Sequence, residues 1–283
     1  MHIVLGGTGN IGSVLASRLL DQGERVTIIS HDEHKRKVWE KKGAEVAVVD
    51  VLEVDKLRKV FDIGERLFLL NPPAAPSTDT VKEEEETLQA ILSALKNSSI
   101  RKVVAESTYG AQPGEGIGDL GVLYEMEQSL ARMDIPSSMM HGAYYMSNWA
   151  LSADQVKKTG KLYSLYPADF KLPMVSPADI GEFGAELMLQ PIERTGNYYI
   201  EGPETYSPAN VADAFAEALD QPVEVITVAE QDWMSYLQKA GFSLPAAKSM
   251  VSMTKLTLEQ NHHTPVSPVY GKTTLKEFIM ALF

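Results

Sequence analysis

A glycine-rich turn near the start of the chain restricts the possible folds more than any other feature. Gly6, Gly9 and Gly12 are spaced as G-x-x-G-x-x-G, directly after the apolar run HIVL and at the start of a helical pattern over 10–22. In such a unit the first glycine permits a tight turn, the second lets the backbone approach a pyrophosphate, and the third lets helix and strand pack closely. The pattern therefore predicts a βαβ unit whose helix N-terminus faces a dinucleotide phosphate.

The alternation of strand and helix continues through the first half of the chain. Apolar runs expected as strands are 2–7, 25–30, 44–50, 66–71, 101–107 and 136–142, and the helical patterns between them are 10–22, 33–42, 53–61, 79–97 and 120–133. Strands that are apolar on both faces indicate a parallel sheet covered by helices. We expect an α/β, doubly wound parallel sheet of the Rossmann type over residues 1–150.

The second half of the chain is less regular. Its expected helices are 175–189, 207–220 and 229–241, with a final helix at the end of the chain, and its expected strands are 196–202 and 222–228. We expect residues 151–283 to form a smaller, mostly helical lobe that binds substrate, although some of its strands could cross back to the first domain. Ligands are expected at the junction of the two parts.

Composition argues against several classes of function. The chain has 283 residues, no Cys and a net charge of −12. Nucleic-acid binding needs a basic face, and disulfide or thiolate chemistry needs Cys, so neither is expected. No apolar run is long enough to span a membrane and no signal peptide follows Met1, so we expect a cytoplasmic protein with no membrane partner. The adjacent His262 and His263 would point apart in regular structure, and no metal site is expected.

The residues after the second strand bear on which dinucleotide would bind. An NAD-preferring site usually places an acidic residue at the end of that strand, on the ribose hydroxyls. Here the strand ends in Ser30 and His31, and Arg36 follows in a basic stretch that could meet a 2′-phosphate. We therefore expect NADP(H) to be preferred over NAD(H), with the alternative that the basic residues form only a solvated helix face.

The other contacts of the cofactor are expected at the ends of the remaining strands. Asp50 would lie beside the adenine, and the Asn71-Pro72-Pro73 segment would lie beneath the ribose and pyrophosphate. The full set of residues expected to bind the cofactor is Gly6, Thr8, Gly9, Asn10, Ile11, Gly12, Ser30, His31, Arg36, Asp50, Val51, Asn71, Pro72, Pro73, Ser107, Gly142, Ala143 and Tyr144.

Several stretches, in order, resemble the NmrA-like branch of the atypical short-chain dehydrogenases/reductases. They are GGTGNIG (6–12), VDVLEVDKLRKVF (49–61), LFLLNPP (67–73), VVAESTYGA (103–111), the segment 124–149 and MVSPADIGEFGAELM (174–188). The resemblance covers most of the chain, up to about residue 245. It implies an NADP-binding fold and either of two roles, an NADPH-dependent quinone reductase or a non-catalytic NADP-sensing regulator.

The chain departs from the general short-chain mechanism. That mechanism uses a Tyr as proton donor or acceptor and a Lys four residues later, whereas Tyr124 is followed at that spacing by Gln128. A Lys that relatives often carry is replaced by Leu123, and their Arg-Pro-Gly segment is replaced by one that begins at His141. Tyr124 and His141 remain as candidate catalytic residues, without an assigned proton relay.

Quinone reduction asks little of the protein beyond holding the nicotinamide and the quinone in contact. Thr108 and Tyr109, at the end of the fifth strand, and Tyr145 and Trp149 are expected to bind the substrate, unless the aromatic residues only pack at the junction. The leading expectation is hydride transfer from NADPH to a quinone or small conjugated carbonyl. The alternatives are a redox sensor that acts through a regulatory protein partner and, less favoured, sugar- or isoflavonoid-type reduction or epimerisation; a homodimer is left open.

Overall fold

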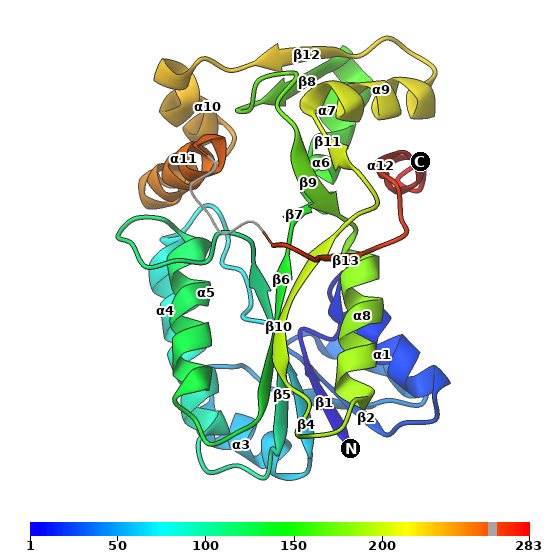
Figure 1. The fold of residues 1–283 in the computed structure, drawn as a ribbon, viewed down its shortest axis with the longest axis vertical. Coiled ribbons are helices and arrows are strands. Elements are labelled where there is room, and N and C mark those ends of the chain that lie inside the picture. Colours follow the sequence, from blue (N-terminus) through cyan, green and yellow to red (C-terminus); the bar gives the residue numbers. More distant parts are fainter. Residues whose placement is uncertain (260–264) are drawn as a thin grey trace.

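The computed structural model describes residues 1–259 and 265–283, and its centre is a parallel sheet (Figure 1). The strands of this sheet are β1 (His2–Leu5), β2 (Val26–Ser30), β3 (Glu45–Val48), β4 (Arg66–Leu69), β5 (Lys102–Thr108), β6 (Ser137–Gly142), β10 (Gly196–Glu201) and β13 (Val269–Tyr270). Within the described residues these eight strands lie in the order β13-β10-β6-β5-β4-β1-β2-β3, and every neighbouring pair is parallel. The doubly wound parallel sheet predicted from the sequence is confirmed.

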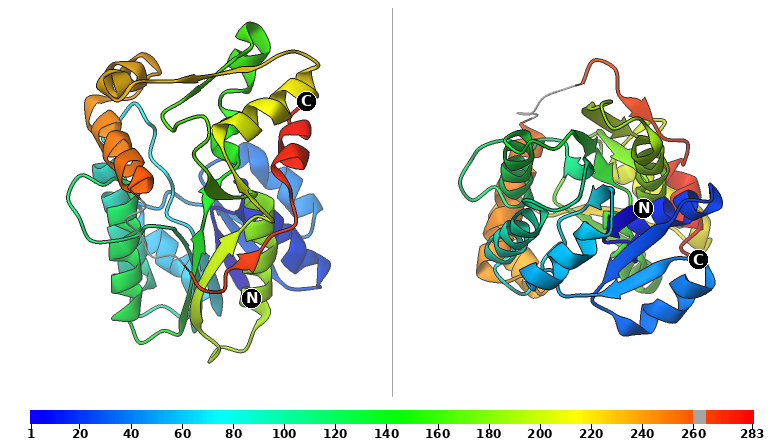
Figure 2. Two further views of the ribbon diagram at one scale, coloured as in Figure 1. Left: turned by 45° about the horizontal axis from the view of Figure 1, so that its top comes forward. Right: turned by 90° about the horizontal axis from the view of Figure 1, so that it is seen from below.

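Helices cover both faces of the sheet (Figures 1 and 2). One face carries α1 (Gly12–Asp21), α2 (Arg36–Lys41) and α8 (Pro177–Leu189), and the other carries α3 (Val54–Asp62), α4 (Thr80–Leu95) and α5 (Asp119–Ala131). A short 3-10 turn, η1 (Glu33–Lys35), precedes α2. The central strands β1, β2, β4, β5 and β6 are buried on both faces, with one apolar cluster under α3, α4 and α5 and a second under α1 and α8. This double burial explains why the strand sequences are apolar without alternation.

The order of the strands determines where a ligand can bind. The chain leaves β1 toward β2 on one side, and β4 lies on the other side of β1. At such a switch point the connections diverge and open a crevice at the carboxyl ends of the strands. Gly6 follows β1 and Leu70 follows β4, and a Cβ added at Gly6 would lie 3.3 Å from the Leu70 side chain. The glycine turn therefore lies at this crevice.

Segments from beyond residue 150 complete the sheet and one of its helical layers. β10 pairs with β6, β13 pairs with β10, and α8 packs against α1. At the carboxyl end of α8, the fully buried Lys102 donates to the carbonyls of Gln190 and Pro191, at 3.2 and 2.9 Å. Residues on both sides of position 150 thus build the sheet, and the division into two domains at that position remains a prediction.

The upper part of the molecule in Figure 1 is a smaller lobe with its own apolar core. Its strands are β7 (Tyr144–Tyr145), β9 (Leu172–Val175) and β11 (Thr205–Tyr206) in one sheet and β8 (Lys161–Ser164) and β12 (Glu224–Thr227) in another. Its helical segments are α6 (Ser147–Ala150), α7 (Ala153–Thr159), α9 (Pro208–Leu219), η2 (Glu230–Asp232), α10 (Trp233–Lys239), α11 (Leu244–Leu258) and α12 (Leu275–Met280). Figure 1 shows α10 and α11 above α4 and α5, across from β7 and β9.

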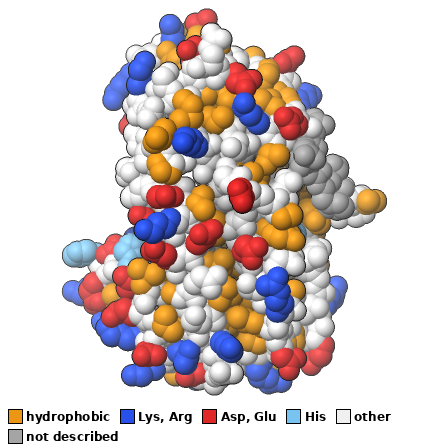
Figure 3. Space-filling model, turned by 90° about the vertical axis from the view of Figure 1, so that its left-hand side faces the viewer, with side chains coloured by type: hydrophobic (Ala, Val, Ile, Leu, Met, Phe, Trp, Pro, Cys, Tyr) orange, Lys and Arg blue, Asp and Glu red, His pale blue; other side chains and the backbone are white. Residues whose placement is uncertain are grey.

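The fold also bears on the predictions about membrane spans, metal sites and surface charge. In the part of the chain that the structure describes, no helix is both long and apolar enough to cross a membrane, and no three acidic or histidine side chains gather as a metal site. His262 and His263 lie outside the described residues. On the face seen in Figure 3, acidic and basic side chains are interspersed over both the upper and the lower half, with hydrophobic side chains between them. This face therefore offers no continuous basic surface.

Candidate functional site

The glycine turn after β1 has the geometry of a phosphate cradle. Gly6 has a φ of 74°, which favours glycine, and the Gly9 N–H donates to the Gly6 carbonyl at 3.0 Å. A Cβ at Gly12 would collide with that same carbonyl oxygen. Gly6 and Gly12 are therefore required by the turn itself.

Gly9 differs from the other two glycines because the protein leaves room around it. A Cβ there would meet only the Gly6 carbonyl oxygen, at 3.4 Å, and both Gly9 and Asn10 are exposed. The first turn of α1 contains no acidic residue, so no carboxylate of that turn neutralises the positive end of the helix. The cradle fits a dinucleotide pyrophosphate held by backbone N–H groups.

The residues predicted at the adenosine ribose differ in their exposure and in their partners within the protein. Ser30 is 5% exposed, and its hydroxyl accepts a hydrogen bond from the Asp32 N–H at 3.0 Å. Arg36 forms an ion pair with Glu33 at 3.0 Å, and His31 is exposed. The ribose end therefore presents an exposed His and a guanidinium that already has one acidic neighbour.

The segments after β3 and β4 are held by their own side chains. Asp50 accepts a hydrogen bond from the Leu52 N–H at 3.0 Å and is exposed. Asn71 donates to the Glu84 carbonyl at 3.1 Å and accepts from the Thr87 hydroxyl at 3.2 Å. These bonds fix the loops that follow the strands at the edge of the crevice.

Glu84 is a buried carboxyl beside the Asn71 loop. Its Oε1 accepts a hydrogen bond from the Ala74 N–H at 2.9 Å, and Glu84 is 6% exposed. Burial, together with the neighbouring Asp119 carboxylate, raises the pKa of Glu84 to about 8. Glu84 is therefore expected to be mainly protonated at neutral pH.

The pKa of Glu84 predicts a pH-dependent contribution to stability. The folded state binds this proton more tightly than the unfolded state, whose carboxyl keeps its ordinary pKa of 4.5, so the contribution is present below pH 4.5 and is lost as pH rises toward about 8. Glu84→Gln removes the titration, and its melting temperature is expected to rise relative to the wild type across this pH window. Thermal melts from pH 4 to about 9 measure how the difference in melting temperature between Glu84→Gln and the wild type changes with pH. Glu85→Gln, at an exposed position, is the control. A constant difference between Glu84→Gln and the wild type would contradict the prediction.

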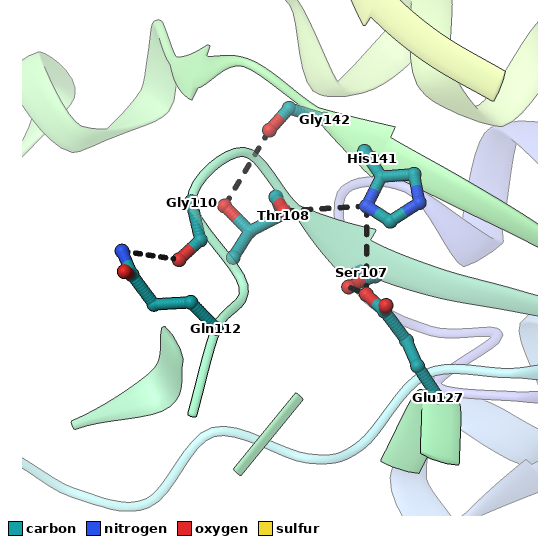
Figure 4. A network of polar contacts seen from close by, with 7 residues as sticks. All are labelled: Ser107, Thr108, Gly110, Gln112, Glu127, His141 and Gly142. Atoms are coloured by element: carbon teal, nitrogen blue, oxygen red, sulfur yellow. Dashed lines mark hydrogen bonds and ion pairs between the residues drawn. The ribbon is translucent and has the colours of Figure 1, made fainter. Parts of the chain in front are cut away.

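A second polar cluster joins the ends of β5 and β6 to α5 (Figure 4). The Ser107 hydroxyl donates to Oε1 of Glu127, and His141 Nδ1 lies 3.4 Å from the same oxygen and 3.4 Å from the Thr108 carbonyl. Burial raises the pKa of Glu127, while the Ser107 hydrogen bond lowers it. The His141 ring stacks on Tyr199 with centroids 4.5 Å apart. Ser107 and His141 are paired across β5 and β6, and the Glu127 carboxyl contacts both of them.

A cavity of about 700 Å³ lies between the carboxyl ends of β5 and β6 and the smaller lobe. Its walls come from the strand ends, the start of α5, β7, β8, α10 and α11. The predicted residues that line it are Thr108, Tyr109, Ala143, Tyr144, Tyr145 and Trp149. Tyr163, Tyr166, Phe170, Tyr236 and Phe242 add further aromatic rings. Of the two catalytic candidates, neither the buried His141 nor the half-buried Tyr124 is among the lining residues.

Two hydrogen-bonded tyrosine–carboxyl pairs lie at the cavity. The Tyr109 hydroxyl donates to Glu201 at 2.9 Å, and the Tyr145 hydroxyl lies 2.7 Å from Oε1 of Glu106. Neither glutamate was anticipated from the sequence. For Glu106 a signal was available, because a carboxyl within the apolar run VVAES has to be buried with the strand.

Comparisons with known proteins agree with this architecture. An NAD(P)H azoreductase from Xenophilus azovorans is 22% identical over 228 residues, which are 81% of this chain and 77% of the relative. The NADPH complex of a quinone oxidoreductase from Escherichia coli superposes with a TM-score of 0.80 at 18% identity, covering 100% of this chain and 99% of the other. The NADP(H) complex of the Citrobacter triphenylmethane reductase gives a TM-score of 0.82 at 15% identity, covering 100% and 99%.

The two solved structures show a shared fold only, because their sequence identity to this chain is low. The family is assigned from the match to a sequence profile. The profile of the NmrA-like family matches residues 2–278, which include the cradle, the ends of the sheet strands and most of the smaller lobe. The chain therefore belongs to the NmrA-like family.

Proposed function

We propose that the chain is an oxidoreductase that binds NADP(H) in the glycine cradle and reduces a quinone or another small conjugated acceptor in the aromatic cavity. The observation that carries this proposal is the position of the cavity. It lies at the carboxyl ends of β5 and β6, on the same edge of the sheet as the cradle after β1. A dinucleotide that starts in the cradle and follows this edge would bring its nicotinamide to the cavity.

Each part of the chain has a defined task in this proposal. The N–H groups of Asn10, Ile11 and Gly12, at the start of α1, would bind the pyrophosphate, and the Asn71-Pro72-Pro73 segment would support the adjoining ribose. The bound cofactor would supply a hydride. The aromatic side chains of the cavity would orient a planar acceptor and exclude water from it. The three relatives are named for the reduction of azo compounds, quinones and triphenylmethane dyes, which favours a conjugated acceptor here too.

A second function, a non-catalytic NADP(H) sensor with a protein partner, is favoured by one observation. Leu123, which stands where relatives often carry a Lys, lines the cavity. An apolar side chain there cannot hydrogen-bond a ribose or lower the pKa of a neighbouring tyrosine. The sensor is thus the alternative if hydride transfer proves absent.

Ligand titration and turnover assays separate these outcomes. We expect the Kd for NADPH to be about tenfold lower than that for NADH, because one charge-assisted phosphate contact is worth roughly 1.4 kcal/mol. Tighter binding of NADH would contradict the assignment of His31 and Arg36 to a 2′-phosphate. Loss of nicotinamide absorbance with a panel of quinones and enones would support the reductase, and binding without turnover across the panel would support the sensor.

A further inference from the structure

Tyr145 and Glu106 form a pair with one member at the cavity and the other behind it. Tyr145 lines the cavity, and its Oη lies 2.7 Å from Oε1 of Glu106. Glu106 lies within β5 and is 4% exposed. Its other oxygen, Oε2, is buried and has no hydrogen-bond partner among the described residues. The phenol is thus the only group at hydrogen-bonding distance from this carboxyl in the described part of the chain.

The neighbouring strand leaves space for this pair. A Cβ added at Gly142 of β6 would lie 2.8 Å from the Tyr145 ring and 3.0 Å from Oε1 of Glu106. A side chain at this position would therefore displace the phenol or the carboxyl. Gly142 was expected to bind the cofactor, and the structure gives it this second, packing role.

The surroundings of Glu106 favour its neutral form. Full burial raises the pKa of Glu106 well above its ordinary value, and the hydrogen bond with Tyr145 is the opposing influence. A neutral carboxyl has an O–H to donate, and Tyr145 Oη is the acceptor within reach. In that arrangement the phenolic hydrogen of Tyr145 is free to turn toward a ligand in the cavity.

We propose that Tyr145 is the proton donor of the reduction and that Glu106 resupplies it. This inference rests on the proposed function, in which the acceptor gains two electrons and one hydrogen as hydride from the reduced cofactor. As negative charge develops on an acceptor oxygen, the Oη–H bond of Tyr145 breaks and a new O–H bond forms on the acceptor. The carboxyl proton of Glu106 moves to Tyr145 Oη, and the Glu106 carboxylate regains a proton from water after the product leaves.

The Tyr145–Glu106 pair would take the place of the missing Tyr-x-x-x-Lys pair as the source of the proton. In the general short-chain mechanism a cationic Lys makes the tyrosine a better acid. Here Trp149, and not a Lys, stands four residues after Tyr145. The buried neutral carboxyl of Glu106 instead replaces the proton that Tyr145 gives to the acceptor. The tyrosine is also on a different element, β7, rather than on the helix that carries Tyr124.

Two acceptors with different proton demands test the proposal. A quinone needs a proton after it receives hydride, whereas a triarylmethyl cation becomes a neutral product by hydride transfer alone. Tyr145→Phe is expected to lower kcat for the quinone about 100-fold, the scale of general acid catalysis, and to lower kcat for the cation far less. Glu106→Gln should also lower kcat selectively for the quinone, but only about tenfold. The glutamine amide can donate a hydrogen bond to Oη of Tyr145 but cannot give up a proton to it.

Controls and a readout apart from turnover complete the test. Tyr198→Phe, a matched change on β10 away from the cavity lining, should leave both rates unchanged. Equal losses with the two acceptors, or no loss with either, would overturn the proton-donor role. The infrared difference spectrum between the wild type and Glu106→Gln at neutral pH should show a protonated-carboxyl band from Glu106, because the neutral Glu84 is present in both proteins and cancels. Absence of this difference band would also overturn the proposal. If the wild type reduces neither acceptor, the proposed function fails and the relay with it, while the infrared band still reports whether the neutral pair exists.

Discussion

Gly9→Asp is expected to lower the affinity for NADPH at least 100-fold while leaving the melting temperature of the free protein unchanged. Gly9 is exposed, and a Cβ there would touch only the Gly6 carbonyl oxygen at 3.4 Å, so the fold accommodates a side chain. A carboxylate at this position would face the pyrophosphate across the open cradle. Like-charge juxtaposition of this kind costs several kcal/mol, and about 2.8 kcal/mol corresponds to the expected 100-fold.

Two further variants separate charge from volume at Gly9. Gly9→Asn has nearly the volume of Gly9→Asp but no charge, and Gly9→Ala adds a single methyl group. We expect the dissociation constant, measured by fluorescence titration with NADPH, to increase in the order Ala, Asn, Asp. Unchanged affinity in Gly9→Asp would contradict the placement of the pyrophosphate in this cradle, and a lowered melting temperature would show that the turn itself had been damaged.

The parts of the fold that depend on local pattern were predictable. The glycine spacing after an apolar run predicted β1, the turn and α1, and the alternation of apolar runs and helical patterns predicted β2 to β6 with their helices. These elements are encoded by short-range features: turn geometry at Gly6, close packing at Gly12 and strands buried on both faces. The residues expected around the cavity, such as Tyr109 and Tyr145, follow from the same rule, because parallel strands end at one edge of the sheet.

Other features depend on contacts between distant segments and were not predictable. The two-residue strand β13 pairs with the end of β10, and so short a segment carries no periodicity. Ser107 and His141 are paired across β5 and β6, but Glu127 reaches them from α5, twenty and fourteen residues away in the sequence, and only the packing of α5 against the strand ends places it there. Ser30 was assigned to the cofactor from its place in the chain, which does not reveal that its hydroxyl bonds to the Asp32 backbone.

The contact between α1 and α8 is the clearest example of a long-range requirement that appears in the sequence only as a glycine. Gly181 lies within α8, where glycine normally weakens a helix. In the structure a Cβ at Gly181 would lie 2.6 Å from the Ile11 carbonyl oxygen and 2.8 Å from the Val14 side chain. The two helices therefore meet backbone to backbone at the start of α1, next to the cradle. Packing in the second half of the chain thus supports the turn in the first.

Gly181→Val is accordingly expected to destabilise the protein by at least about 3 kcal/mol, the upper part of the range for overpacked cores. For a chain of this size that corresponds to a fall in melting temperature of about 5 °C. NADPH affinity should fall as well, because the displaced α1 begins directly after the cradle. Gly121→Ala is the matched control: Gly121 is also helical, but its Cβ would have no neighbour closer than 3.4 Å, so stability should be unchanged or slightly raised. A melting temperature for Gly181→Val equal to that of the wild type would contradict the backbone contact between α1 and α8.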